Sequence, residues 1–180
     1  RDPLFLRFVR LRRLPDERTL SRGLKSLTAP YCNQLNELLR DVAYQTCEEI
    51  SLARATIEFD GTVLRSSECV DGAERGFSPH HPKDPSYYPL TAHLAQTGQL
   101  LGVWNRPGNV HDSVGAAEHL AALLADVRRR LGSIPLEVRL DGAFFHEAVL
   151  GVLTASRVEY AVKVPMWKWL GVRQRIAARR

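Results

Sequence analysis

The feature that most constrains the fold is a run of strand and helix patterns over residues 55–165. Three β-rich segments come first, at residues 55–64, 86–95 and 100–108, and "TGQ" marks a turn between the last two. A long helical pattern follows at residues 111–132, with Asp112 or Ser113 as the expected N-cap and Gly132 just beyond its end. A strand at 136–145, a helix at 146–157 and a strand at 158–165 complete the run. The predicted order is therefore β-β-β-α-β-α-β.

This order predicts an α/β fold with a mixed sheet, because hairpins give antiparallel strands and βα crossovers give parallel ones. It is the ribonuclease-H-like layout, in which the first and fourth strands lie side by side in parallel. Residues 1–50 predict a helical N-terminal segment that is interrupted at Pro15 and Pro30. We therefore expect a helical segment at 1–50 with possible DNA contact, a core at 51–165, and a basic insertion or linker that starts at 166–180.

Length and composition are those of a soluble globular protein. The 180 residues are enough for one sizeable core, and 44% are hydrophobic while 25% are charged. No apolar run reaches the roughly 18 residues of a membrane helix, and no signal peptide opens the chain. We expect an intracellular protein without a membrane partner. Cys32, Cys47 and Cys69 lack metal-binding spacing and are expected to be reduced thiols.

Charge is distributed unevenly along the chain. Residues 1–30 hold eight Lys or Arg against three acids, residues 31–150 hold ten against sixteen, and residues 151–180 hold seven against one. Basic ends around an acidic middle fit a protein whose ends contact a polyanion. The candidate DNA contacts are Arg18, Arg22 and Lys25 in the first helical segment and Lys168, Arg173 and Arg175 in the tail. Ordinary solvated helix faces explain the same pattern, so both interpretations stay open.

Two aspartates end strands in matching ways. Asp60 stands in "EFDGTV" and Asp141 in "VRLDGAFF", each followed by a glycine that lets the backbone turn sharply. Because the first and fourth strands are expected to be parallel neighbours, both carboxylates should emerge at one edge of the sheet. Two like charges at that distance repel, and a divalent cation removes the conflict. The pair therefore predicts a metal site, although Asp-Gly also caps turns very often.

The longer segments resemble the catalytic core of the DDE transposases of bacterial insertion sequences. The resemblance rests on "TIEFDGTV", "GFSPHHPKDPSYYPLTAHLAQTGQLLGVWNRPGNVHDSVGA", "VRLDGAFF" and "VEYAVKV" and covers residues 15–165. It implies two Mg²⁺ or Mn²⁺ ions held by two aspartates, here Asp60 and Asp141, and by a later glutamate. It also implies an endonuclease and strand-transfer activity on element ends and target DNA, a homodimer in the DNA complex, and a bacterial, nucleoid-associated location.

The third acid departs from the family pattern. The resemblance implies a Tyr-x2-Arg-x3-Glu-x6-Lys helix, but only 39 residues follow Asp141 and no tyrosine has arginine three residues on. Glu147 and Glu159 are the only acids left, and both stand where an ordinary helix or strand start would put them. We therefore expect the glutamate outside this sequence, with weak metal binding and little catalysis by this chain alone.

Several other polar and aromatic residues are also candidates for a role in the site, and some of them allow two interpretations. Arg106 and Asn109 in "RPGNVHD", with His111 and Asp112, either approach the site and its DNA or only shape the loop and cap the next helix. His80 and His81 are expected on the surface, and Trp104 in the core. Trp167 and Trp169 either stack on unpaired bases or pack on the protein.

Two further functions fit the same residues. Besides a transposase core, they are a DNA-binding remnant or regulator without catalysis and another ribonuclease-H-like nuclease. Fold alone does not choose, because this fold carries several chemistries.

Overall fold

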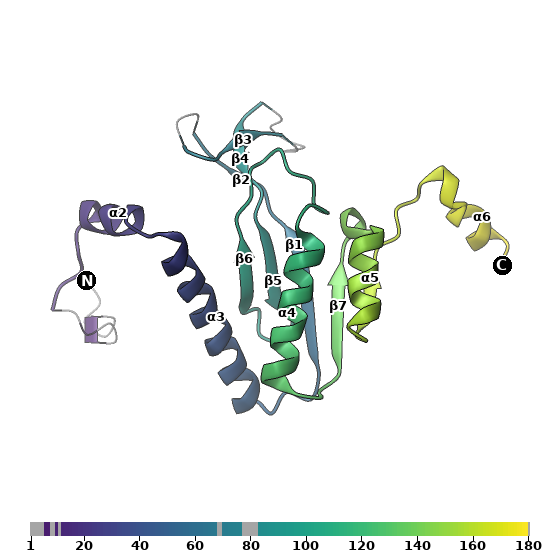
Figure 1. Cartoon of the computed structure of the whole chain (residues 1–180), viewed down its shortest axis with the longest axis horizontal. Coiled ribbons are helices and arrows are strands. Elements are labelled where there is room, and N and C mark those ends of the chain that lie inside the picture. The colour runs from purple at the N-terminus through teal and green to yellow at the C-terminus, as the bar shows by residue number, and fades with distance from the viewer. Residues whose placement is uncertain (1–5, 8–9, 11, 68–69, 77–82, 180) are drawn as a thin grey trace. The chain divides into compact units, whose positions relative to one another are not determined.

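The computed structural model describes residues 6–7, 10, 12–67, 70–76 and 83–179. The chain divides into two compact units, Arg1–Glu37 and Leu38–Arg180, and the division falls within one helix, α3 (Ala29–Glu49) (Figure 1). The domain boundaries expected near residues 50 and 165 stay predictions.

The first unit contains α2 (Glu17–Lys25) and the start of α3. Asp16 is the N-cap of α2, since its carboxylate accepts a hydrogen bond of 2.7 Å from the Thr19 N–H, as the "LPDER" sequence predicts. The expected break near Pro30 is present, because residues 26–28 separate α2 from α3. Pro30 lies in the first turn of α3, where a helix N–H has no partner inside the helix and proline is tolerated.

The second unit is built on a five-stranded sheet in the order β6-β5-β1-β7-β8. Its strands are β1 (Ala55–Gly61), β5 (Leu90–Leu94), β6 (Leu100–Trp104), β7 (Leu136–Leu140) and β8 (Glu159–Val162). β1, β5 and β6 pair antiparallel, whereas β1, β7 and β8 pair parallel. The predicted β-β-β-α-β-α-β order and the ribonuclease-H-like fold are confirmed.

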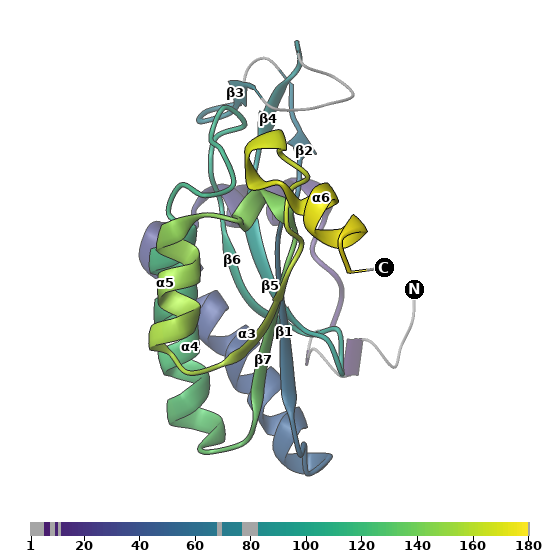
Figure 2. The same cartoon turned by 90° about the vertical axis from the view of Figure 1, so that its right-hand side faces the viewer.

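Two helices form the crossovers between the parallel strands. They are α4 (Ala116–Leu131) and α5 (Glu147–Ala155), and Figures 1 and 2 show both on the same side of the sheet. Gly132 ends α4 with a φ of 66°, as predicted. The expected N-cap at Asp112 or Ser113 is wrong, because the residues up to Gly115 form turns and α4 begins only at Ala116.

The core lies between the helices and one face of the sheet. Alternate residues of β1 and β7, among them Ile57, Phe59 and Val138, are fully buried, as period-two side-chain alternation requires. The second half of α3 adds Ala43, Tyr44 and Cys47 to the core. Trp104 packs against Phe59 with ring centroids 5.9 Å apart, which confirms its predicted place in the core.

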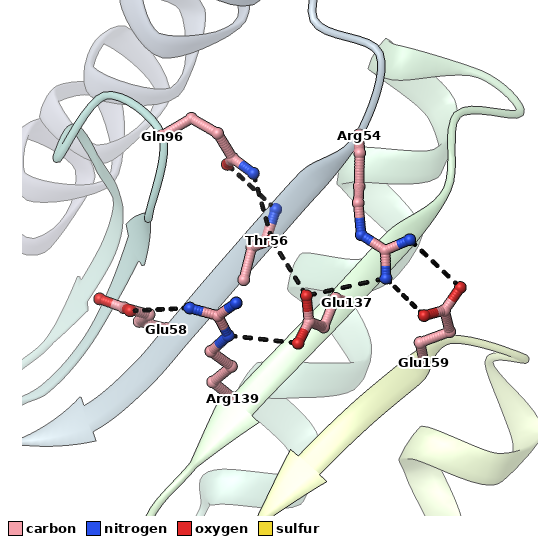
Figure 3. Close-up of polar contacts among 7 residues, drawn as sticks. All are labelled: Arg54, Thr56, Glu58, Gln96, Glu137, Arg139 and Glu159. Atoms are coloured by element: carbon pink, nitrogen blue, oxygen red, sulfur yellow. Dashed lines mark hydrogen bonds and ion pairs between the residues drawn. The ribbon is translucent and has the colours of Figure 1, made fainter.

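The opposite face of the sheet is polar. Figure 3 shows Glu137 at the centre of a network in which Thr56, Arg54 and Arg139 contact its carboxylate. Arg54 also pairs with Glu159 at the start of β8. These residues occupy the positions between the core residues of the same strands, so one strand sequence supplies both an apolar and a charged face.

Short elements complete the second unit. A small sheet of β2 (Leu64–Arg65), β4 (Pro85–Tyr87) and β3 (Glu74–Arg75) was not predicted. The expected strand at 86–95 is divided into β4 and β5 at Pro89, which has no N–H for a strand ladder. The 3₁₀ turns η1 (Gly142–Phe144) and η2 (Lys168–Leu170) and helix α6 (Val172–Ala177) follow β7 and β8. In the part of the chain that the structure describes, no helix is long and apolar enough to span a membrane.

Candidate active site

The parallel pairing of β1 and β7 brings Asp60 and Asp141 together. Phe59 pairs with Leu140, so the next residue along each strand is one of the two aspartates. Asp60 lies within β1 opposite Thr91, and Asp141 follows the last residue of β7. Both expected site residues therefore stand at the carboxyl ends of neighbouring strands, where the sequence analysis predicted them.

Each aspartate also stabilises the turn that follows it. The Asp60 Oδ1 accepts a hydrogen bond of 2.8 Å from the Gly61 N–H, and the Asp141 Oδ1 accepts one of 2.9 Å from the Ala143 N–H. Asp141 is thereby the N-cap of η1. Turn capping and the formation of a carboxylate pair are both present, so the two explanations of the Asp-Gly sequences do not exclude one another.

The electrostatics of the pair favour a cation. Asp60 is exposed as a residue, but part of its carboxyl group is shielded from water, and this desolvation raises its pKa above the usual value. The N–H of Gly61 opposes the shift, the charges of Asp141 and Asp112 add to it, and His93 opposes it. A divalent ion would relieve the repulsion among these carboxylates. The local charge thus identifies Asp112 as a third acid that acts on Asp60.

The loop after β6 is held by Arg106. This side chain is only 8% exposed, and its guanidinium donates hydrogen bonds to four main-chain carbonyls. The bonds measure 3.0 Å to Tyr88, 3.2 Å to His111, 3.3 Å to Asp112 and 2.7 Å to Val114. Because these N–H groups are directed into the protein, we replace the expected DNA contact of Arg106 with a structural role.

The same loop places Asp112 beside the first aspartate. A Cβ atom added to Gly61 would lie 2.5 Å from Asp112 Oδ1 and 2.8 Å from Tyr88 Cζ, so only glycine fits there. The same Cβ would lie 2.9 Å from the Tyr88 hydroxyl oxygen; burial is the main reason that the pKa of Tyr88 is raised, and the neighbouring Asp112 adds to the effect. The sequence did not single out Tyr88. The only signal for it is its place directly before Pro89, in the break between β4 and β5.

The remaining residues of the "RPGNVHD" segment are more exposed. Asn109 is exposed and passes close to Gly76, where an added Cβ would lie 2.7 Å from the Asn109 nitrogen. His111 is exposed, and its Nδ1 lies 3.0 Å from the Ser113 hydroxyl. Asn109 stays a candidate DNA contact, whereas His111 shapes its own turn.

The predicted basic contacts are accessible to solvent. Arg18, Arg22 and Lys25 are exposed on α2 in the first unit, and Lys168, Arg173 and Arg175 are exposed in the second. Trp167 and Trp169 stack on one another with centroids 5.6 Å apart, and Trp169 remains 77% exposed. Phe145 contacts Trp167 edge to face at 6.3 Å, which ties this tail to the segment after Asp141.

The remaining predictions concern two histidines and three cysteines. His80, His81 and Cys69 lie outside the described residues. Cys32 and Cys47 are free thiols, as predicted.

Neither remaining glutamate joins the pair. Glu159 begins β8 and is bound by Arg54, and its partner in the sheet, Glu137, lies near the start of β7, so both stand at the far end from Asp141. Glu147 is an exposed residue in the first turn of α5. These placements agree with the prediction that neither residue is the third acid.

Two carboxylates are a donor set that suits magnesium or manganese. Among the residues that the structure describes, no three His, Cys, Asp or Glu side chains lie close enough to enclose a metal ion. Mg²⁺ commonly takes one or two protein carboxylates and completes its coordination with water and phosphate oxygens. Asp60 and Asp141 therefore fit an ion that is shared with a phosphate-bearing substrate.

Comparisons with solved structures give distant likenesses to transposases. The catalytic domain of Mos1 mariner transposase is 11% identical, with a TM-score of 0.46, over 85% of this chain and 71% of that one. The Mos1 transposase in a paired-end complex with the left transposon end is 14% identical, with a TM-score of 0.43, over 83% of this chain. The Drosophila P element transposase in a strand transfer complex is 10% identical, with a TM-score of 0.42, over 83% of this chain.

This chain spans 44% of the Mos1 chain in the paired-end complex and 34% of the P element chain. A search of curated proteins gave no match. The sequence profile of the family described as "Transposase DDE domain group 1" matches residues 1–177. That match extends over both aspartate strands and the Arg106 loop, and the chain therefore belongs to the DDE transposase domain family, group 1.

Proposed function

We propose that this chain is the metal-dependent catalytic core of a DNA transposase and that Asp60 and Asp141 are its metal ligands. The observation that carries the proposal is the β1–β7 register, which sets the two carboxylates side by side at one edge of the sheet. Membership of the DDE transposase family supports it. The reaction is phosphodiester hydrolysis at the ends of an insertion sequence, followed by transfer of the freed strand to target DNA.

The protein's part in this reaction is to hold two anionic groups in fixed positions. The hydrogen bonds from Gly61 and Ala143 orient the two carboxylates, and the shielding around Asp60 makes its charge costly without a cation. Bound Mg²⁺ or Mn²⁺, expected as two ions, would supply Lewis-acid stabilisation of the charge that develops on the phosphoryl oxygens. The chain's own carboxylates then fix where the phosphodiester must lie.

DNA is the proposed partner, in the form of element ends and target. The exposed cations on α2 and in residues 168–175 supply candidate phosphate contacts. A homodimer would pair two element ends, and we expect the protein at the bacterial nucleoid in the cytoplasm.

A plasmid assay tests the proposed reaction. Supercoiled plasmid and a labelled oligonucleotide are incubated with the chain and Mn²⁺, and nicking and joining are measured separately. Little activity is expected of this chain alone, because the third acid is expected outside it, but nicking and joining that require Mn²⁺ and are lost in Asp60→Asn and Asp141→Asn support a transposase. Nicking without joining points instead to another nuclease of this fold. Salt-sensitive DNA binding that ignores Mn²⁺, without nicking, points to a regulator.

A further inference from the structure

The Arg106 loop contains a carboxylate that the proposed reaction does not use. Asp112 lies in the turns before α4, and two of the four carbonyls that Arg106 holds belong to Asp112 itself and to the residue before it. The guanidinium also lies over the Tyr88 ring, 5.3 Å from its centroid. Four hydrogen bonds and a ring contact thus fix the backbone from which the Asp112 side chain projects.

That side chain reaches β1 at the residue next to Asp60. Asp112 Oδ1 would lie 2.5 Å from a Cβ on Gly61, the residue directly after Asp60. Backbone and steric observations therefore agree that Asp112 lies beside the end of β1 that carries Asp60.

One oxygen of this carboxylate is left without a partner. Asp112 Oδ1 is buried and accepts no hydrogen bond from the described residues. A buried anionic oxygen without a donor is destabilising, and such groups in folded proteins commonly serve a functional site. A cation held nearby would offset that cost.

We propose that Asp112 is a positioning residue that strengthens divalent-cation binding by Asp60 and Asp141. This inference rests on the proposed function, because it presumes that the two aspartates bind metal. Among the described residues no three acids form a group that could hold a metal ion, so Asp112 acts through its negative charge rather than as a ligand. The Arg106 guanidinium beside it offsets part of that charge, so the expected effect is smaller than the roughly 10- to 100-fold loss that is typical when partners of metal ligands are removed.

The test is a Mn²⁺ titration of the full chain by calorimetry. Asp112→Asn removes the charge and keeps the size and shape of the side chain. We expect Mn²⁺ affinity to fall by roughly 3- to 10-fold with little change in the melting temperature. Asp41→Asn is the matched control, since it removes one carboxylate that pairs with Arg130 on the surface. That control is expected to bind Mn²⁺ as the wild type does.

Two more variants separate charge from structure. Tyr88→Phe removes the hydroxyl that lies beside Asp112 but keeps the carboxylate, so it should lose less affinity than Asp112→Asn. Equal losses in both variants, accompanied by lower melting temperatures, would indicate a purely structural role and overturn the inference. Asp112→Ser removes the same charge with a smaller side chain and replaces Asp112→Asn if that variant does not fold.

The titration distinguishes failure of the inference about Asp112 from failure of the proposed function. If the wild type binds Mn²⁺, Asp60→Asn does not, and Asp112→Asn binds as the wild type does, only the role of Asp112 is refuted. If the wild type itself does not bind Mn²⁺, the proposed metal site is refuted and the role of Asp112 with it.

Discussion

Replacing Arg106 with methionine should strongly destabilise the second unit. The guanidinium is 8% exposed and donates to the carbonyls of Tyr88, His111, Asp112 and Val114. Methionine has a similar length and fills much of the same space, but it donates no hydrogen bond. The change therefore isolates the polar part of the side chain's contribution.

The magnitude follows from the number and kind of bonds lost. Each hydrogen bond from a charged donor contributes about 1.5 to 3 kcal/mol net, so four bonds would suggest roughly 6 to 12 kcal/mol. Three of the four bonds are donated by one nitrogen, Nη1, so their contributions are not independent. Burial also lowers the pKa of Arg106, because removing the charged guanidinium from water costs free energy that offsets part of the stabilisation by the hydrogen bonds. Water would also reach the carbonyl of Val114, a 57% exposed residue. We therefore expect a loss of about 3 kcal/mol, a large part of the typical 5 to 15 kcal/mol total.

The assay is urea unfolding, with amide hydrogen exchange over residues 107–115. Arg129→Met is the matched control, because that arginine is 70% exposed and should cost no more than about 0.5 kcal/mol. Loss of exchange protection in the loop should accompany the loss of stability in Arg106→Met. A change below about 1 kcal/mol, or an unchanged exchange pattern, would refute the assignment of Arg106 as the residue that organises this loop.

Three further predictions follow from the same region. Asp60→Asn should raise the metal-free stability at pH 7, because it removes a carboxylate whose pKa is raised in the folded state; the gain should vanish in melting curves below about pH 4, where the carboxyl group is protonated in both states. Gly61→Ala should cost about 2 kcal/mol in urea unfolding, because its Cβ would lie 2.5 Å from Asp112 Oδ1, and should also weaken Mn²⁺ binding. Burial lowers the pKa of His119, which stacks on Trp104 at 4.9 Å, so its neutral form is favoured in the folded state. Stability should therefore fall as the pH drops below about 6.5, and His119→Phe should show a flatter melting-temperature profile between about pH 6.5 and 5.

The main chain of the core was predictable because its signals are local. Period-two alternation in "TIEFD" and "LEVRLD" defines the buried faces of β1 and β7, and the order of strands and helices determines that the two strands are parallel neighbours. With the register known, the position of Asp60 beside Asp141 follows. The pair was therefore accessible to sequence reasoning before any tertiary contact was known.

The surroundings of the pair were not predictable, because they depend on contacts between distant segments. Arg106 reads as a surface cation in sequence, and only the fold shows that its guanidinium binds carbonyls from two other segments. Asp112 reads as a helix cap, yet α4 begins at Ala116 and the carboxylate turns toward Gly61 instead. Neither interaction leaves a periodic signal in the sequence.

The central claim is that Asp60 and Asp141 form one metal site, and a Mn²⁺ titration by calorimetry tests it most directly. The wild type is compared with Asp60→Asn and Asp141→Asn, and circular dichroism confirms that all three are folded. The account predicts binding in the millimolar range or tighter for the wild type and none for either folded variant. Absence of binding in the wild type, or binding that survives in both variants, would contradict it.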